Sequence, residues 1–227
     1  PWGQQLFRPR NEERPVRFGI ALGLNVLDFR ITNTAAPAAV GEAGEEGGYF
    51  ATVDGIMPGF NVNALIRFRF TEDFHLRMMP GICFGQRTIS FYRVLPGSDQ
   101  DGSLALKTQL ETAYIEMPIL LCYQALRDSN VRPYAVLGVS PRIDAAAFKK
   151  LKVESKQYLQ LRRYDLAYEI GLGCEFYFPY FKMAPEIKWS ASVLPGLSNT
   201  VAEGGEAYRA AIKGLTGQGF IFSLVFE

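Results

Sequence analysis

The sequence predicts an all-β fold: a single up-and-down antiparallel transmembrane β-barrel of eight strands, with long outer loops and short periplasmic turns. Three observations predict this fold. Large apolar residues alternate with small or polar ones at a period of two, which is the period of a β-strand. The connections between the alternating segments are in turn short and long, as in barrels that cross a membrane. The polar faces are rich in Gly, Ala and Ser, which suit the crowded interior of a narrow barrel.

The alternating segments define the strands. In residues 164–178 every even position is Tyr, Leu, Ile, Cys or Phe, whereas the odd positions are small or charged except for Tyr177. This segment is well beyond the usual length of about five or six residues for strands in globular sheets. The seven other predicted strands lie within residues 16–26, 60–70, 74–87, 112–123, 132–144, 181–192 and 219–227.

The connections order these strands into a meander. Three short connections lie at residues 71–73, 128–130 and 179–180. Four long ones lie at residues 32–58, 93–111, 145–163 and 194–218. Strict alternation places all short turns, and with an even strand number both termini, at one end of the barrel. We therefore expect residues 1–15 to be an N-terminal periplasmic segment and residues 16–227 to form the outer-membrane barrel.

Four prolines, Pro80, Pro118, Pro141 and Pro185, lie inside predicted strands. Proline has no N–H to donate to a neighbouring strand, and a closed barrel has no edge strand to hold it. We expect β-bulges or register breaks at these positions.

The apolar face can point to lipid or to a soluble core, and the size of its residues decides between them. Rows of six to eight large side chains per strand would not fit inside a narrow barrel. Facing outward, they form the apolar band with aromatic ends that a membrane barrel requires. A soluble lipid-binding barrel remains the alternative. The candidates for the aromatic girdle at the strand ends are Tyr123, Tyr164, Phe178, Tyr180, Phe181 and Trp189.

The same assignment directs many charged residues inward. Both signs are present, so they can pair across the lumen instead of remaining isolated in a low dielectric. They can form a structural plug or a path for protons or small ions, and a general porin is disfavoured because side chains fill an eight-stranded barrel. The candidate lumen charge network is Arg67, Arg69, Arg77, Arg87, Glu116, Arg142, Glu169, Glu175, Lys182, Glu186 and Lys188.

Composition excludes several classes of protein. The 24 Lys and Arg against 23 Asp and Glu give a net charge of +1, which rules out a chain that binds nucleic acid by neutralising phosphates. Cys83, Cys122 and Cys174 are too few and too far apart for a disulfide scaffold or a structural zinc site. No stretch reaches the roughly 18 apolar residues of a membrane-spanning helix. We expect no cofactor and no metal.

Catalytic chemistry has little support, because His75 is the single histidine. A hydrolytic site at the outer rim needs a base such as His beside its nucleophile, whereas His75 adjoins the short turn at residues 71–73. With Asp73 and Arg77 it forms a local group that we expect to be polar surface at the start of a strand. We expect no enzyme and no catalytic residue, and an outer-membrane lipid- or peptide-modifying enzyme remains the alternative.

Two features lie in the long outer loops. Lys149, Lys150, Lys152 and Lys156 form a basic patch that can contact lipopolysaccharide phosphates or an acidic partner, or belong to a solvated hairpin. Residues 206–213 have short helical character, which suits a partner contact or a lid.

Several segments resemble PorT-like proteins, the outer-membrane barrel components of type IX secretion and gliding motility. The densest likeness is Tyr168-Glu169-Ile170-Gly171-Leu172-Gly173, followed by Phe178-Pro179-Tyr180-Phe181-Lys182 and Pro185-Glu186-Ile187-Lys188. Leu22-Gly23-Leu24-Asn25 and Tyr114-Ile115-Glu116-Met117-Pro118 add to it. The resemblance implies a non-enzymatic role in export of proteins that carry a type IX signal. It implies other secretion subunits as partners, beside outer-membrane lipid and lipopolysaccharide, and no nucleic acid.

Overall fold

The computed structural model describes residues 14–33, 48–53, 55, 57–94, 103–145, 159–201 and 212–227. These residues contain no helix, so none is present that could cross a membrane. The strands in the described part of the chain are β1 (Val16–Asn33), β2 (Gly48–Val53), β3 (Pro58–Arg69), β4 (Phe74–Met78), β5 (Gly81–Val94), β6 (Ser103–Glu116), β7 (Ile119–Gln124), β8 (Val131–Asp144), β9 (Leu159–Leu161), β10 (Tyr164–Tyr177), β11 (Lys182–Ser192), β12 (Leu197–Val201) and β13 (Ile212–Phe226).

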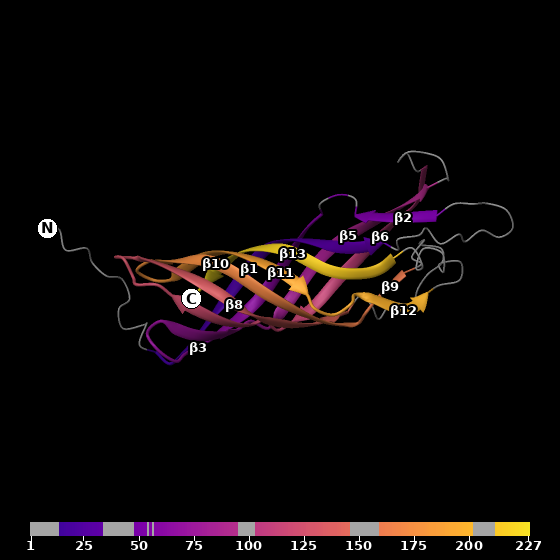
Figure 1. The fold of residues 1–227 in the computed structure, drawn as a ribbon. Coiled ribbons are helices and arrows are strands. Elements are labelled where there is room, and N and C mark those ends of the chain that lie inside the picture. The colour runs from indigo at the N-terminus through magenta and orange to yellow at the C-terminus, as the bar shows by residue number, and fades with distance from the viewer. Residues whose placement is uncertain are drawn as a thin grey trace, which may run out of the picture.

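Eleven of these described strands form one antiparallel sheet that closes on itself (Figure 1). Its order is β10-β11-β13-β1-β3-β4-β7-β8-β6-β5-β2, and the pairing of β10 with β8 completes the ring. In three cases two consecutive strands lie end to end and form one segment of the wall: β2 with β3, β4 with β5, and β6 with β7. We call each such pair, and each remaining strand of the ring, a stave. The ring then has eight staves, and the predicted eight-stranded antiparallel barrel is confirmed.

The three short turns lie together at one end of the barrel, where β1 begins and β13 ends (Figure 1). They connect β3 to β4, β7 to β8, and β10 to β11. At the opposite end the strands reach further than the sequence predicts. β2 lies inside the predicted loop 32–58, and β5 and β6 extend into the predicted loop 93–111.

The last two predicted loops also contain strands. β9 and β12 pair with each other as a separate two-stranded sheet. β13 begins at Ile212, so Ile212 and Lys213 are strand and not the predicted helix. The rest of that helical segment, residues 206–211, lies outside the described residues.

The expected bulges at the mid-strand prolines are absent, because the register is unbroken on both sides of each. Ile66 faces Met78 before Pro80, and Asn63 faces Gly81 after it, which is the same register. β8 and β11 continue through Pro141 and Pro185 without a shift. The prolines interrupt hydrogen bonding alone, which is why Pro80 and Pro118 separate β4 from β5 and β6 from β7.

Proline loses only its N–H as a donor, and the carbonyls of Pro80, Pro118 and Pro141 still accept hydrogen bonds from a neighbouring stave. The amide of Met79 donates to the Pro118 carbonyl at 2.9 Å. Proline cannot return a bond to the Met79 carbonyl, and the Asn63 side-chain amide donates to that oxygen instead, at 3.2 Å. A polar side chain inside the barrel thus takes the place of one missing rung.

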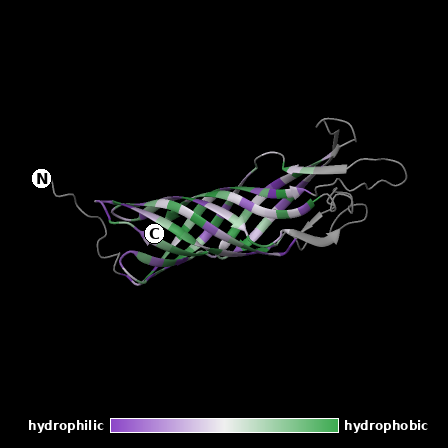
Figure 2. Cartoon of the chain, viewed as in Figure 1, coloured by the Kyte–Doolittle hydropathy of each residue, from purple (hydrophilic) through white to green (hydrophobic). Residues whose placement is uncertain are grey.

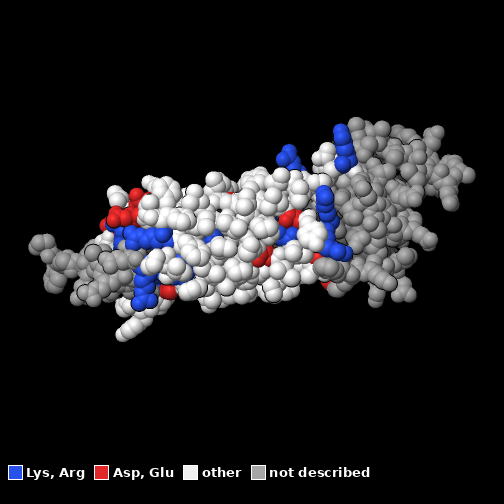
Figure 3. All heavy atoms as spheres, turned by 90° about the horizontal axis from the view of Figure 1, so that it is seen from below, with Lys and Arg blue, Asp and Glu red and all other residues white. Residues whose placement is uncertain are grey.

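Large apolar side chains cover the outside of the barrel in the zone between its two ends. The outward residues of β1 include Phe18, Leu22 and Leu24, which are 72%, 46% and 63% exposed. Figure 2 shows hydrophobic and hydrophilic residues alternating along the staves, and Figure 3 shows charged side chains near the two ends of an otherwise uncharged wall. This is the alternation that a lipid-facing wall requires.

Beyond this zone the two faces of the wall exchange polarity. On β1 the outward row changes from Leu24 and Val26 to Asp28 and Arg30, while the inward row changes to Phe29. Inside the barrel at this end lies the outer apolar cluster, which consists of Phe29, Ala51, Ile89, Phe91, Leu110, Ile212 and Leu215. The wall therefore continues past the lipid band with an apolar core and a polar outside, as a water-exposed sheet does. The sequence pattern of a lipid-facing strand stops at this point, which explains why the extensions were assigned to loops.

Candidate functional site: the charged interior of the barrel

Ten of the eleven predicted lumen charges are buried inside the barrel. The exposed fraction of their residues runs from 0% for Arg67, Arg77, Glu169 and Glu175 to 5% for Arg142. Arg69 differs, because it is the last residue of β3 and is partly exposed, and its Nε donates to the Thr71 carbonyl in the following turn at 3.1 Å. The structure therefore places Arg69 at the periplasmic rim.

Glu175 on β10 is the centre of the periplasmic half. Its Oε1 accepts from Arg67 at 2.8 Å and from Lys182 at 3.0 Å. Its Oε2 accepts from the Gln124 amide at 2.7 Å and the Tyr177 hydroxyl at 2.8 Å. One buried carboxylate thus receives donors from β3, β7, β10 and β11, which satisfies most of its capacity to accept hydrogen bonds.

Two ion pairs bridge the whole lumen. Arg67 on β3 and Glu175 on β10 are four staves apart in either direction round the ring, and their N···O distance is 2.8 Å. Arg77 on β4 and Glu186 on β11 are also four staves apart, and their N···O distance is 2.6 Å. Pairs between opposite staves occupy the centre of the barrel.

The network continues through the middle of the barrel. Glu186 also accepts from the Tyr134 hydroxyl at 2.7 Å, and Lys188 lies between Glu186 at 4.0 Å and Glu169 at 2.9 Å. Glu169 in turn pairs with Arg142 at 2.8 Å. Every one of these carboxylates therefore has a cation beside it, which is the condition for keeping charges in a low-dielectric interior.

Arg142 on β8 connects Glu169 to Glu116 on the adjacent stave, and so extends the network further round the barrel. It lies 3.4 Å from Glu116, and it donates to the Ser190 hydroxyl at 2.8 Å. Glu116 accepts from the Asn63 amide at 3.0 Å, and Asn63 accepts from Asn61 at 2.9 Å. The charged network thus extends from the periplasmic mouth to the level of Asn61.

The network contains several residues beyond the predicted ones. Glu227 pairs with Arg67 at 2.6 Å and with Lys182 at 2.6 Å, and Arg17 lies 3.4 Å from it. Burial alone would raise the pKa of the Glu227 carboxyl, but the charges of Arg67 and Lys182 outweigh burial and hold the pKa below its usual value. Arg17 and Glu227 share the inward parity of their strands, so the alternation contained the signal for both. The tyrosines Tyr134 and Tyr177 carry no charge to reveal them.

Arg87 marks the outer limit of the charged interior. It is 3% exposed, and no described carboxylate lies within ion-pair distance of it. Its guanidinium donates to the Tyr114 hydroxyl at 3.2 Å and lies 4.3 Å from the centre of the Phe29 ring. Aromatic faces stabilise a cation in such a site, and Phe29 belongs to the outer apolar cluster above it.

The prediction that Asp73, His75 and Arg77 form a polar surface group is wrong. His75 and Arg77 are buried in the lumen, at 1% and 0% exposure, and Arg77 pairs with Glu186. Asp73 remains at the rim, 3.6 Å from Arg132. The residues separate because His75 and Arg77 have inward parity on β4 whereas Asp73 lies in the turn.

No other described residues form a chemical centre that sequence reasoning missed. The described part of the chain contains no group of three or more His, Cys, Asp or Glu that could hold a metal ion. Cys83 and Cys122 are buried as free thiols, and Cys174 is partly exposed on the outer face. The predicted basic patch of Lys149, Lys150, Lys152 and Lys156 lies outside the described residues.

Solved outer-membrane proteins show a low similarity to the chain. The attachment invasion locus protein Ail of Yersinia pestis, solved with the heparin analogue sucrose octasulfate, is 12% identical with a TM-score of 0.40, over 94% of this chain and 99% of that one. OprG of Pseudomonas aeruginosa is 14% identical with a TM-score of 0.45, over 92% and 93%. Neisserial surface protein A is 7% identical with a TM-score of 0.43, over 93% and 98%. No curated protein shows a significant match.

A family model provides the assignment. The model for the outer membrane protein beta-barrel domain matches residues 2–201, which is most of the 227 residues. The match agrees with the closed antiparallel ring, the apolar outer wall and the charged interior. The chain therefore belongs to the family of outer membrane protein beta-barrel domains and resides in the outer membrane.

Proposed function

We propose that this chain is a non-enzymatic integral component of the type IX protein secretion system, needed for export of signal-bearing cargo through interactions with other secretion subunits. The resemblance of its strand segments to PorT-like proteins supports the secretion role. The filled interior supports the mode of action.

The observation that carries the proposal is the pair of ion pairs that cross the lumen. Arg67 with Glu175 and Arg77 with Glu186 join opposite staves, so side chains occupy the axis along which a polypeptide would have to pass. Opening this path would separate buried charges, which costs about 3–5 kcal/mol for each broken pair. A barrel of this kind serves secretion through its rims, its loops or its lipid-facing wall.

Export of cargo in a deletion strain tests the role. Loss of type IX cargo from the medium is expected on deletion, and a plasmid copy of the chain should restore it. A strain that lacks an outer-membrane barrel unrelated to secretion is the control for loss of membrane integrity. Normal export of type IX cargo in the deletion strain would overturn the proposal.

Co-purification in mild detergent tests the interaction with other subunits. Secretion subunits should accompany the tagged chain after cross-linking, and should be absent from a preparation of an equally abundant tagged barrel. Recovery of the chain alone, under conditions that keep other secretion complexes intact, would contradict the proposed mode of action.

His75 separates this proposal from an outer-membrane enzyme. It lies inside the barrel, where His75→Ala removes no group accessible to a lipid or peptide substrate. We expect this variant to fold, insert and support export. A folded and inserted His75→Ala protein without activity in export would favour the enzyme.

A further inference from the structure

In the described part of the chain, the pairing of β1 with its neighbouring stave is interrupted on one side. Pairing between β1 and β3 ends at Val26 and Pro58. The next hydrogen bonds between β1 and the stave of β2 and β3 are made by Asn33. Its side chain donates to the Ala51 carbonyl at 3.0 Å and accepts from the Ala51 amide at 3.3 Å. Among the described residues, 27–32 of β1 have no ladder partner on this side. An interruption in an otherwise continuous ladder leaves main-chain groups of β1 without ladder partners on this side within the described ranges, while the inward side chains of Leu27 and Phe29 stay buried, at 6% and 4% exposure.

The interruption arises where β2 gives way to β3. β2 ends at Val53 and β3 begins at Pro58, and between them Gly55 has a φ of 85°. This left-handed conformation suits glycine, since a side chain there would be strained. The regular pairing of this stave therefore stops at Val53 and resumes at Pro58.

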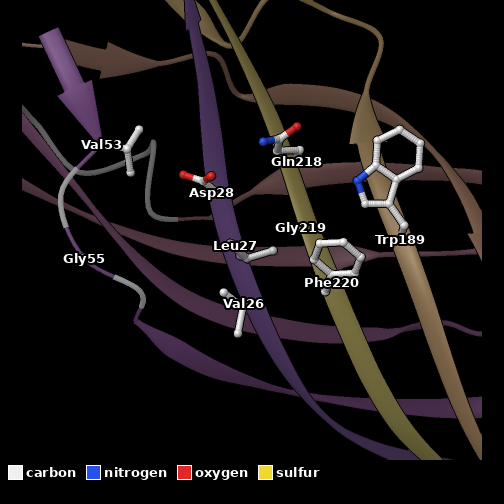
Figure 4. A pocket seen from close by; sticks show the side chains of 9 residues that line it. All are labelled: Val26, Leu27, Asp28, Val53, Gly55, Trp189, Gln218, Gly219 and Phe220. Atoms are coloured by element: carbon white, nitrogen blue, oxygen red, sulfur yellow. The ribbon is translucent and has the colours of Figure 1, made fainter.

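A pocket of about 460 Å³ lies at this interruption (Figure 4). Val53 and Gly55 line one side of it, and Asp28 on β1 lies opposite them. Gln218 and Trp189 line its far side, on β13 and β11. Its volume is in the range of sites that hold small molecules, which is about 300–1,000 Å³.

The pocket is apolar toward the lipid band and polar toward the outside. Val26, Phe220 and Trp189 belong to the outward apolar rows, whereas Asp28 and Gln218, which face each other across β1 and β13, begin the polar rows. The pocket thus straddles the height at which the wall changes polarity. A molecule with a hydrocarbon chain and a polar head would match both parts.

The apolar part of the pocket continues into the barrel. Val53 lines the pocket and also packs against the outer apolar cluster. Leu27, from the inward row of β1, is a further lining residue and is only 6% exposed. A chain entering from the side therefore meets apolar side chains from the interior instead of charges.

Asp28 determines the kind of head group. One oxygen of its carboxylate accepts from the Phe29 amide at 2.7 Å, and the other accepts no hydrogen bond from a described residue. No described cation lies within ion-pair distance of Asp28. A free carboxylate repels an anionic head and accepts hydrogen bonds from a hydroxyl, amide or ammonium group.

We propose that this pocket binds a single-chain amphiphile from the outer leaflet whose head group is neutral or cationic and donates hydrogen bonds. The chain of the amphiphile lies against Trp189, Phe220 and Val26, and its head group lies beside Asp28 and Gln218. The site is independent of the proposed secretion role, because it requires only the isolated barrel.

Fluorescence of Trp189 provides the test. The chain has two tryptophans, Trp2 and Trp189, so Trp2→Phe in the full-length protein leaves the pocket residue as the only tryptophan. The probes are chain-brominated dodecylamine, monododecanoylglycerol and dodecanoic acid, added to the protein in detergent micelles at a pH where the amine is protonated and the acid ionised. The amine and the glycerol ester should quench the Trp189 fluorescence saturably. The acid should quench it only in proportion to its concentration in the micelle.

Two variants on the same row of β1 separate the pocket from the general lipid face. Val26→Phe fills the pocket and should abolish saturable quenching, whereas Leu24→Phe, outside the pocket, should retain it. Asp28→Asn should weaken binding of the amine about tenfold, which corresponds to 1.4 kcal/mol, and leave the glycerol ester nearly unchanged.

Competition in the Trp2→Phe protein distinguishes binding at the pocket from general quenching in the micelle, even if a pocket variant folds poorly. Unlabelled dodecylamine should displace the brominated amine and restore the fluorescence. Quenching that no competitor reverses, or that is equal in Val26→Phe and Leu24→Phe, would overturn the site. Saturable binding of the acid in preference to the amine would overturn the assignment of the head group.

Discussion

Replacement of Glu175 by glutamine should remove most of the stability of the barrel's periplasmic half. Glutamine has nearly the same size but no charge, so Arg67 at 2.8 Å, Lys182 at 3.0 Å and Arg77 at 3.7 Å lose their shared anion. All four residues are almost completely buried. Removal of one partner from a buried ion pair costs about 3–5 kcal/mol, and three cations around one site place Glu175→Gln at the upper end of this range.

Equilibrium unfolding in urea, with the protein inserted in lipid vesicles, measures this effect. The free energy of unfolding extrapolates linearly to water, and a loss of about 5 kcal/mol is large against the 5–15 kcal/mol that stabilise a typical domain. Glu72→Gln is the matched control, because Glu72 is exposed in the turn after β3. Its effect should stay within about 0.5 kcal/mol.

A second substitution identifies the cause of the loss. Arg67→Met in the Glu175→Gln background removes one of the three cations that shared Glu175, while Glu227 keeps Lys182 and Arg17 beside it. This variant should recover part of the stability, since an apolar group of similar volume can replace a buried charge pair at little cost. A loss below about 1 kcal/mol for Glu175→Gln alone would refute the reasoning. It would show that the interior cations are stabilised by water and not by the carboxylate of Glu175.

Three further substitutions test the wall of the barrel. Asn33→Ala removes both hydrogen bonds to the main chain of β2 and should destabilise that strand by about 1–3 kcal/mol, measured as faster hydrogen exchange of β2 amides. Gly138→Ala should cost about 1–3 kcal/mol of unfolding free energy, because its new methyl group would overlap the carbonyl of the neighbouring strand, whereas Gly214→Ala, with no other atom nearer than 3.8 Å, should be nearly neutral. Leu22→Arg should cost about 2–4 kcal/mol in vesicles, as for a charge at mid-membrane, while Thr32→Arg on the same row of β1 should be tolerated.

Each of these expectations has a contrary outcome. Unchanged exchange in β2 after Asn33→Ala would mean that the strand does not depend on this tie. Equal unfolding free energies for the two glycine variants would contradict the close approach of strands at Gly138. If Thr32→Arg destabilised the barrel as much as Leu22→Arg, the membrane would extend beyond the observed change of polarity.

The sequence was sufficient for the fold because lipid imposes a local rule. Every residue of a lipid-facing strand meets either hydrocarbon or the interior, so the alternation in residues 164–178 predicts both a strand and its orientation. The rule ends where the membrane ends. From Asp28 outward on β1 the wall is a water-exposed sheet around an apolar core, and the lipid-facing alternation that predicts the strand over residues 16–26 does not continue there.

The effect of the mid-strand prolines also could not be predicted from the local sequence. Pro118 was expected to break the register, but its effect depends on what its neighbours can supply. The neighbouring stave provides Met79 as a donor, and Asn63 provides the amide that proline lacks. Asn63 is 55 positions away in the chain, so no local pattern around Pro118 could reveal the compensation.

The sequence by itself determined which residues face the lumen, since parity along a strand decides the side of the wall. Parity therefore predicted ten of the buried charges, whereas Arg69 lies at the end of its strand and Arg17 and Glu227 were not predicted. Only the tertiary structure decided which cation meets which carboxylate. Arg67 meets Glu175 because the ring places β3 opposite β10, and strand order and register are long-range properties that the alternation of one strand does not encode. The interruption beside β1 is likewise visible only in three dimensions, because it depends on where two staves fail to meet.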